Sequence, residues 1–108
     1  MSAVMLLKWP MLIGIVVTLN VGSVLAETIT VTIDKLVFTP ATISAKVGDT
    51  IEWINKDILA HTATVKEGWD VTIPAGKSAS LTLGKIGSVE YYCRFHPNMK
   101  GRVTVAAP

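Results

Sequence analysis

The chain has 108 residues, half of them hydrophobic, and a formal net charge of +2. Its basic and acidic residues are interspersed, which argues against nucleic acid as a partner because nucleic-acid binding needs a concentrated basic surface. A single cysteine excludes an internal disulfide framework. These limits indicate one small domain with a lone thiol whose role needs an explanation.

The first 26 residues have the pattern of a secretory signal peptide. A start with one basic residue is followed by an almost unbroken aliphatic run over residues 11–19, and then by small residues. This order predicts cleavage after Ala26. An uncleaved membrane anchor is the competing interpretation, but the apolar run falls short of the ~20 residues of a spanning helix. We therefore expect an exported, periplasmic domain of residues 27–108, with no membrane attachment after cleavage.

From residue 27 onward, hydrophobic side chains recur at every second position, which is the period of a half-buried β-strand. Turn-forming residues such as Pro40, Gly48 and Gly84 separate these runs, and residues 67–77 form the longest irregular stretch. Seven or so short strands without an amphipathic helix predict an all-β fold, an antiparallel sandwich or barrel of the Greek-key type. The expected strands are 28–33, 42–47, 51–53, 61–66, 79–83, 89–93 and 103–105.

The segment Tyr92–Gly101 is the most informative part of the sequence. It contains Cys93, His96 and Met99 at the spacing Cys-x2-His-x2-Met, and the second histidine of the chain, His61, lies 32 residues before the cysteine. One thiol, two imidazoles and one thioether are the donor set of a type 1 (blue) copper centre. In such a centre two histidines and a cysteine form a plane, and a weak methionine ligand lies on its axis.

Strand alternation predicts how these donors meet. Cys93 and His61 both fall on inward-facing positions, while His96 and Met99 are expected in the loop between the last two strands. Pro97 fixes its own φ and stiffens that loop. The sequence therefore predicts one copper ion at these four residues.

Each donor alone has a simpler explanation. A lone cysteine is often a buried small hydrophobic residue, Met99 could fill a gap in the core, and His61 could be a hydrogen-bonded residue at a strand end. All four together, in inward or convergent positions, favour a metal site. Zinc is the competing ion, but structural zinc sites prefer four strong ligands.

Several segments resemble the cupredoxin family, and within it amicyanin and its relatives. The short His-x2-Met step is the amicyanin spacing, and the resemblance covers nearly all of residues 27–108. The segments that carry it are Phe38–Pro40, Val47–Thr50, Trp53–Asn55, Ala60–Thr62 and Tyr92–Gly101.

The resemblance implies that His61, Cys93 and His96 are equatorial copper ligands and that Met99 is the axial one. It also has limits. Amicyanins usually have Asn directly after the first ligand histidine, where this chain has Thr62, and this chain lacks their extended N-terminal segment. The stretch between the first histidine and the cysteine is also shorter than in amicyanins. The methylamine dehydrogenase partnership of amicyanin is therefore not implied.

The expected function is one-electron transfer by a monomeric Cu(II)/Cu(I) carrier. A donor and an acceptor of the dehydrogenase or cytochrome c type would dock transiently near His96, on an apolar patch that includes Phe95, Pro97, Leu59 and Ala60. Three basic residues either rim this patch and steer an acidic partner or are ordinary solvated charges of the loop. They are Arg94, Lys100 and Arg102.

Two other functions compete with electron transfer. A copper carrier or chaperone would be favoured by methionine-rich tracts, but residues 27–108 contain one methionine, Met99. Enzyme activity is not expected, because a Cys93–His96 nucleophile and base pair would lack an evident orienting residue.

Overall fold

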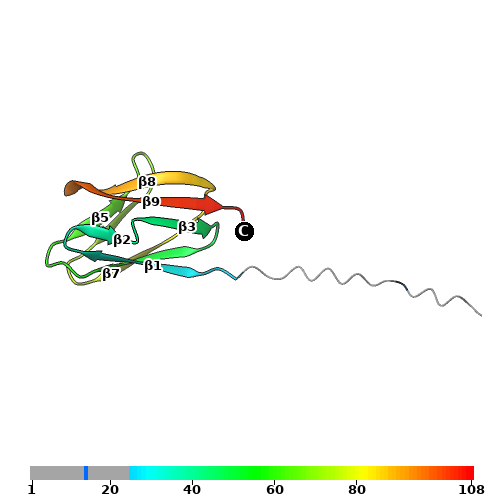
Figure 1. Ribbon diagram of the computed structural model, residues 1–108, viewed down its shortest axis with the longest axis horizontal. Helices are drawn as coiled ribbons and strands as arrows, with labels where there is room; N and C mark the ends of the chain where they lie inside the picture. The colour runs from blue at the N-terminus through cyan, green and yellow to red at the C-terminus, as the bar shows by residue number, and fades with distance from the viewer. Residues whose placement is uncertain (1–13, 15–24) are drawn as a thin grey trace, which may run out of the picture.

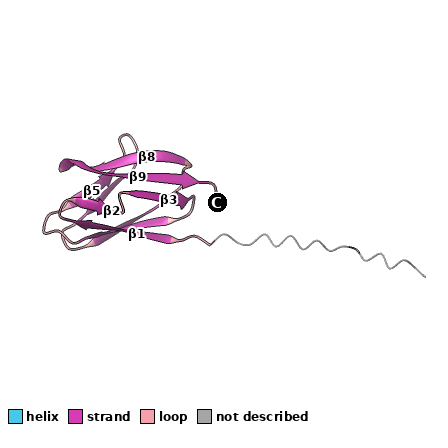
Figure 2. Ribbon diagram, in the orientation of Figure 1, coloured by secondary structure: helices cyan, strands magenta, loops and turns pink. Residues whose placement is uncertain are grey.

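The computed structural model describes residue 14 and residues 25–108. The predicted signal peptide, residues 1–26, therefore lies almost entirely outside the described residues. Within the described part every regular element is a β-strand (Figure 1, Figure 2). In the same part there is no helix of the length and apolar character needed to cross a membrane.

The strands form a two-layer sandwich, which confirms the all-β prediction (Figure 2). One sheet has four strands in the order β2-β1-β4-β7, and the other has five in the order β3-β9-β8-β5-β6. The strands are β1 (Thr28–Asp34), β2 (Val37–Thr39), β3 (Thr42–Lys46), β4 (Thr50–Asn55), β5 (His61–Thr64), β6 (Asp70–Ile73), β7 (Ser78–Thr82), β8 (Gly87–Cys93) and β9 (His96–Ala106).

Both sheets are mixed rather than purely antiparallel, which corrects one detail of the prediction. β1 runs parallel to β4, and β3 runs parallel to β9. The chain leaves the first sheet after β2, adds β3 to the second sheet and returns as β4, so β4 enters beside β1 in the same direction. Alternation of side chains fixes which face is buried, but it carries no information about strand direction.

Two strands lie where none was expected. β2 follows the first strand directly, and β6 lies inside residues 67–77, which were expected to be irregular. β2 has three residues and β6 has four, and the turn-forming residues beside them, Pro40, Gly68 and Pro74, indicated loops rather than strands. Their partners, β1 and β5, supply the hydrogen bonds that make them strands.

The core contains a cluster of aromatic rings beneath β8. The Tyr91 ring lies 4.7 Å from Phe38, 5.7 Å from Trp53 and 5.6 Å from Trp69, measured between ring centroids. Burial raises the pKa of Tyr91 above its ordinary value, and its hydroxyl accepts a 3.4 Å hydrogen bond from Trp53 Nε1. Gly101 faces Tyr91 across the β8–β9 ladder, and a Cβ at this position would overlap the tyrosine ring. The glycine therefore leaves room for the Tyr91 ring to pack against β9.

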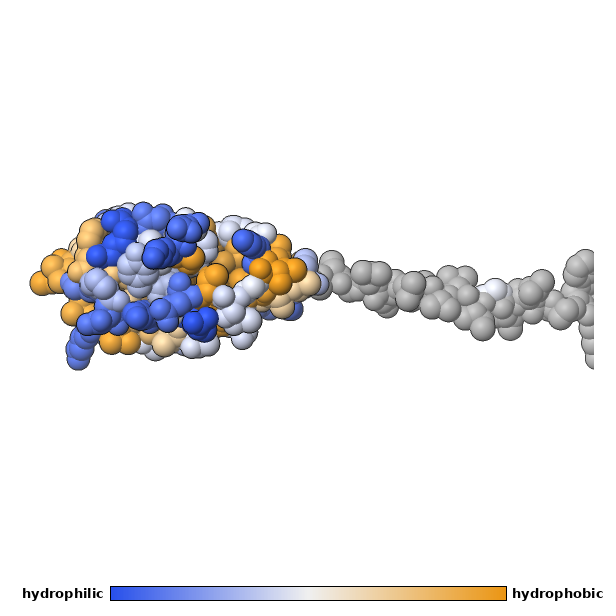
Figure 3. Space-filling view, turned by 90° about the horizontal axis from the view of Figure 1, so that it is seen from above, coloured by the Kyte–Doolittle hydropathy of each residue, from blue (hydrophilic) through white to orange (hydrophobic). Residues whose placement is uncertain are grey.

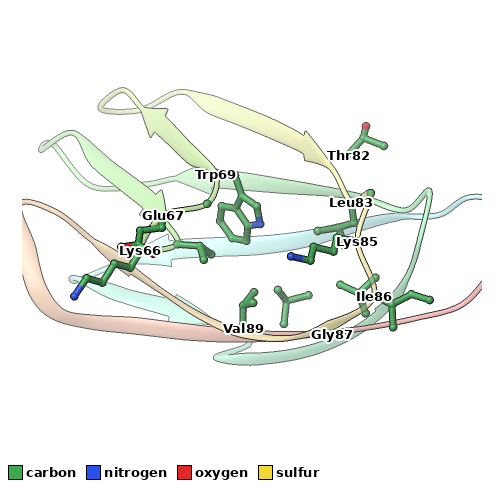
Figure 4. Close-up of a pocket in the computed structure, with 14 residues that line it drawn as sticks. Lys66, Glu67, Trp69, Thr82, Leu83, Lys85, Ile86, Gly87 and Val89 are labelled. Atoms are coloured by element: carbon green, nitrogen blue, oxygen red, sulfur yellow. The ribbon is translucent and has the colours of Figure 1, made fainter.

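A cavity of about 300 Å³ opens between the sheets near the start of β8 (Figure 4). Its wall is mainly apolar, with Trp69 and Val89 on the inside and Lys66 and Lys85 among the lining residues. It lies beyond the C-terminal end of β5, whereas His61 is the first residue of that strand.

Candidate metal centre

Three predicted donors meet at one end of the sandwich. This is the end at which β8 turns into β9 (Figure 1). The Cys93 sulfur lies 3.7 Å from His61 Nδ1 and 3.7 Å from His96 Nδ1. All three donor atoms lie within 4.8 Å of one another. The structure therefore brings together three of the four predicted donors.

Met99, the fourth predicted donor, lies in β9, three residues after His96. Its side chain is 5% exposed, and it lines a shallow hollow together with His96, Phe95 and Leu36. It therefore lies on the same side of the site as His96.

The turn that carries the donors differs from the predicted loop. β8 ends at Cys93 and β9 already begins at His96, so only Arg94 and Phe95 lie between the strands. A register shift at Tyr92 and Cys93 pairs the cysteine with His96 across the ladder. The backbone of a tight hairpin, rather than a long loop, thus sets the spacing between the thiol and the second imidazole.

The first histidine is held by the loop that precedes β5. Buried Asn55 ties this loop down, because its side-chain amide donates to the carbonyls of Leu59 (2.8 Å) and Ile73 (3.2 Å). His61 and Cys93 are both fully buried, whereas His96 is half-buried. One side of the site is therefore enclosed and the other reaches the surface.

Asp57 fixes the orientation of His61. Its Oδ2 atom lies 2.8 Å from His61 Nε2, and its carboxylate also accepts the backbone N–H groups of Lys35 (2.7 Å) and Leu36 (3.0 Å). These amide donors, that of Leu36 first, lower the pKa of Asp57 below its ordinary value, so it is ionised at neutral pH. A carboxylate can only accept, so His61 Nε2 carries the proton and Nδ1 presents its lone pair toward Cys93.

The turn opposite Asp57 is shaped for this contact. Lys35 and Leu36 have φ angles of 53° and 64°, a left-handed backbone conformation that residues other than glycine rarely adopt. Two successive residues of this kind point their N–H groups to one side, where an anion can bind. Sequence reasoning missed Asp57 as a support for His61. Its position four residues before a candidate ligand was the available signal.

Thr62, the position at which amicyanins usually have Asn, also contacts the site. Its backbone N–H donates to the Cys93 sulfur at 3.4 Å, and its Oγ1 atom accepts the backbone N–H of Arg94 at 2.9 Å. One hydroxyl therefore connects the strand of the first histidine to the turn after the cysteine.

The chemistry of this trio fits copper. A thiolate sulfur suits Cu(I) and imidazole nitrogen suits Cu(II), so a mixed set can hold both oxidation states. Three strong donors beside a thioether do not match the four strong ligands of a structural zinc site.

Residues 11–105 match the family model of the Cupredoxin-like domain. The chain belongs to the cupredoxin-like family. Two curated relatives are the amicyanins of Paracoccus versutus and Paracoccus denitrificans. The first is 27% identical over 87 residues, covering 74% of this chain and 66% of the relative. The second is 31% identical over 84 residues, covering 71% and 64%. The chain thus spans just under two thirds of the length of both relatives.

Solved structures of amicyanin share the fold of this cupredoxin. The reduced Cu(I) form of one amicyanin variant, solved at pH 4, superposes with a TM-score of 0.68 at 30% identity, covering 73% of this chain and 82% of that chain. The oxidised form of another variant gives a TM-score of 0.68 at 29% identity, covering 72% and 81%.

Proposed function

We propose that this cupredoxin is a type 1 copper protein that carries single electrons between redox partners. His61, Cys93 and His96 would be the equatorial ligands and Met99 the axial ligand. The observation that carries the proposal is the meeting of one thiol sulfur and two Nδ1 atoms within 4.8 Å of one another. The family, and the Cu(I) form in which a related amicyanin variant was solved, support the choice of metal.

A bound copper ion would supply one-electron chemistry by passing between Cu(II) and Cu(I). The protein's part is to keep its donors in place during that change. His61 is oriented by Asp57, and Cys93 accepts the Thr62 N–H at the end of a paired strand. Because these groups are buried and hydrogen-bonded, little rearrangement accompanies the gain or loss of an electron.

His96 is the proposed site of electron exit and entry, because it is the half-buried histidine. Hydrophobic side chains gather at this end of the domain (Figure 3). Phe95 is 53% exposed and Leu36 is 44% exposed, and both line the hollow beside His96. Leu59, in the loop before His61, is 50% exposed. A small apolar patch suits the weak, transient complexes of redox proteins, here with partners of the dehydrogenase or cytochrome c type.

Export through cleavage after Ala26 is supported by how Glu27 is held. Its backbone nitrogen donates to Asp49 Oδ1 at 2.9 Å, and its carbonyl accepts the N–H of Thr50 at 2.9 Å. Cleavage at this point would turn that nitrogen into an ammonium group beside a carboxylate, which strengthens the contact. The mature domain would act in the periplasm as a monomer.

A copper carrier that hands its ion to another protein is the alternative. Such a carrier needs donors that an acceptor can reach, whereas His61 and Cys93 are fully buried and Met99 is 5% exposed. This burial favours an ion that stays in place while only the electron leaves.

The test is to add cupric salt to the purified protein and record its visible and EPR spectra, followed by potentiometry. An intense thiolate-to-copper absorption and a reversible one-electron potential are expected. A sample that stays colourless and EPR-silent would contradict the proposal. Rapid loss of the ion to a mild chelator, without a reversible potential, would favour the carrier instead.

A further inference from the structure

The outward face of β5 is buried, although alternation predicts a polar, solvent-facing surface there. Thr62 is 0% exposed and Thr64 is 6% exposed. Burying a hydroxyl is unfavourable unless it is hydrogen-bonded, so the partners of these two side chains need to be accounted for.

The two hydroxyls belong to a closed ring of hydrogen bonds that also includes Asp70 and Arg94; we call these four residues the Thr62 ring. Thr62 Oγ1 lies 2.9 Å from Thr64 Oγ1, which donates to Asp70 Oδ1 at 2.6 Å. Arg94 Nε donates to the same carboxylate oxygen at 3.1 Å, and its backbone N–H donates to Thr62 Oγ1 at 2.9 Å. The ring thus connects β5, β6 and the turn between β8 and β9.

The carboxylate fixes the direction of every hydrogen bond in the ring. The Thr64 hydroxyl and the Arg94 guanidinium lower the pKa of Asp70, so it is ionised at neutral pH and can only accept. The Thr64 hydroxyl must then donate its hydrogen bond to Asp70 and accept one from the Thr62 hydroxyl. The Thr62 hydroxyl in turn donates to Thr64, which leaves its lone pair facing the Arg94 N–H.

We propose that Asp70, Thr64 and Thr62 are positioning residues for the metal donors: they orient one hydroxyl so that it holds the backbone of Arg94. The turn consists of Arg94 and Phe95 alone, so a fixed Arg94 amide also fixes the distance between Cys93 and His96. An Asn side chain at position 62 could hold the Arg94 amide by itself. In this chain two hydroxyls and a carboxylate together hold it. The effect of the Thr62 ring on bound copper rests on the proposed function. The effect of the ring on the turn does not depend on a metal.

The direct test follows the Arg94 amide in the metal-free, full-length protein by NMR hydrogen exchange. Thr62→Val removes the acceptor with little change of shape and should speed exchange at Arg94 about tenfold. Thr62→Ser keeps the hydroxyl and should restore slow exchange. The control is Thr72→Val, on the same sheet face and paired with Thr62 across the β5–β6 ladder. Equal Arg94 exchange in Thr62→Val and Thr72→Val would overturn the proposal.

A second variant pair tests whether Asp70 acts through the ring. Asp70→Ala should also speed exchange at Arg94, although the carboxylate does not contact that amide. Its control is Glu90→Ala, which removes an acidic residue of similar exposure that pairs with basic side chains of the same sheet. Asp70 is 48% exposed, so the variant should fold even if a substitution at buried Thr62 does not. An unchanged Arg94 rate in Asp70→Ala would overturn the relay.

The copper-loaded variants then separate positioning from a merely structural role. A looser turn lets His96 leave the reduced site more easily, so Asp70→Ala should raise the reduction potential more than Glu90→Ala and should alter the Cu(II) EPR signal. Faster Arg94 exchange with an unchanged potential and EPR signal would overturn the positioning role. Failure of the wild-type protein itself to form the coloured site would contradict the proposed function alone, because the exchange test needs no metal.

Discussion

The two histidines of the site present their Nδ1 atoms at the same 3.7 Å from the Cys93 sulfur, but from opposite settings. His61 is fully buried and its other nitrogen lies 2.8 Å from the Asp57 carboxylate. His96 is half-buried and lies beside the exposed ring of Phe95. One histidine anchors the site within the domain and the other brings it to the surface. An electron carrier needs both, because rigidity and access are required on different sides of the ion.

The largest expected effect on the copper site comes from Cys93, whose sulfur lies beside both histidines. Cys93→Ser should abolish the intense thiolate-to-copper absorption, because a hydroxyl does not replace the sulfur in that transition. Visible spectroscopy of the copper-loaded protein measures this. Met99→Leu is the control: it removes only the proposed weak axial ligand, so it should keep the colour and shift the potential. A Cys93→Ser protein that keeps its blue colour would show that the metal is bound elsewhere.

The comparison between the histidines predicts unequal costs in stability. In the metal-free protein, His61→Ala should lower the free energy of unfolding by roughly 2–3 kcal/mol, since it leaves a cavity and a carboxylate without its partner. His96→Ala should change it by about 0.5 kcal/mol or less, as expected for a side chain near the surface. Urea unfolding measures both. Equal losses would mean that the two settings do not differ energetically.

Asp57→Asn tests the buried, His61 side of the site through the pH dependence of stability. The folded-state pKa of Asp57 is lowered, so its carboxylate contributes stability above the ordinary value of 3.8 and loses it as the pH falls through the folded value. The variant should therefore be less stable than wild type at neutral pH, and the difference should shrink in acid. Urea unfolding as a function of pH measures this, with Asp34→Asn, at the exposed end of β1, as control. A difference that does not change with pH would rule out the carboxylate charge as its cause.

The smallest expected effect is on the rate of association with a partner at the exposed, His96 side of the site. Lys100 and Arg102 lie 3.7 Å and 3.9 Å from the Glu90 carboxylate, so part of their charge is already balanced. Replacing both with Ala should slow association with an acidic redox partner only about two- to threefold at low salt, and not at all at high salt. Stopped-flow kinetics measures this. Lys66 and Lys85, which line the cavity near the start of β8, provide the matched double-alanine control. Equal slowing by both double variants would point to net charge rather than local steering.

Sequence reasoning missed two supports of the site. Asp57 belongs to a turn cluster in the sequence, and only the fold brings the N–H groups of Lys35 and Leu36 and the ring of His61 around it. Thr62 was a departure from the family pattern, and Asp70, which is linked to it through Thr64, lies on a strand that the sequence did not indicate. Hydrogen bonds between residues far apart in the chain leave no local pattern to detect.

The sequence by itself determined which side chains face inward and which donors are available. Alternation with a period of two is local, so it correctly placed His61 and Cys93 in the interior, and the Cys-x2-His-x2-Met spacing predicted the donor set. The tertiary structure decided the direction of the strands, the two-residue turn between Cys93 and His96, and the carboxylates that orient the donors. These features depend on how the two sheets pack together, and that packing is a property of the whole chain rather than of any one segment.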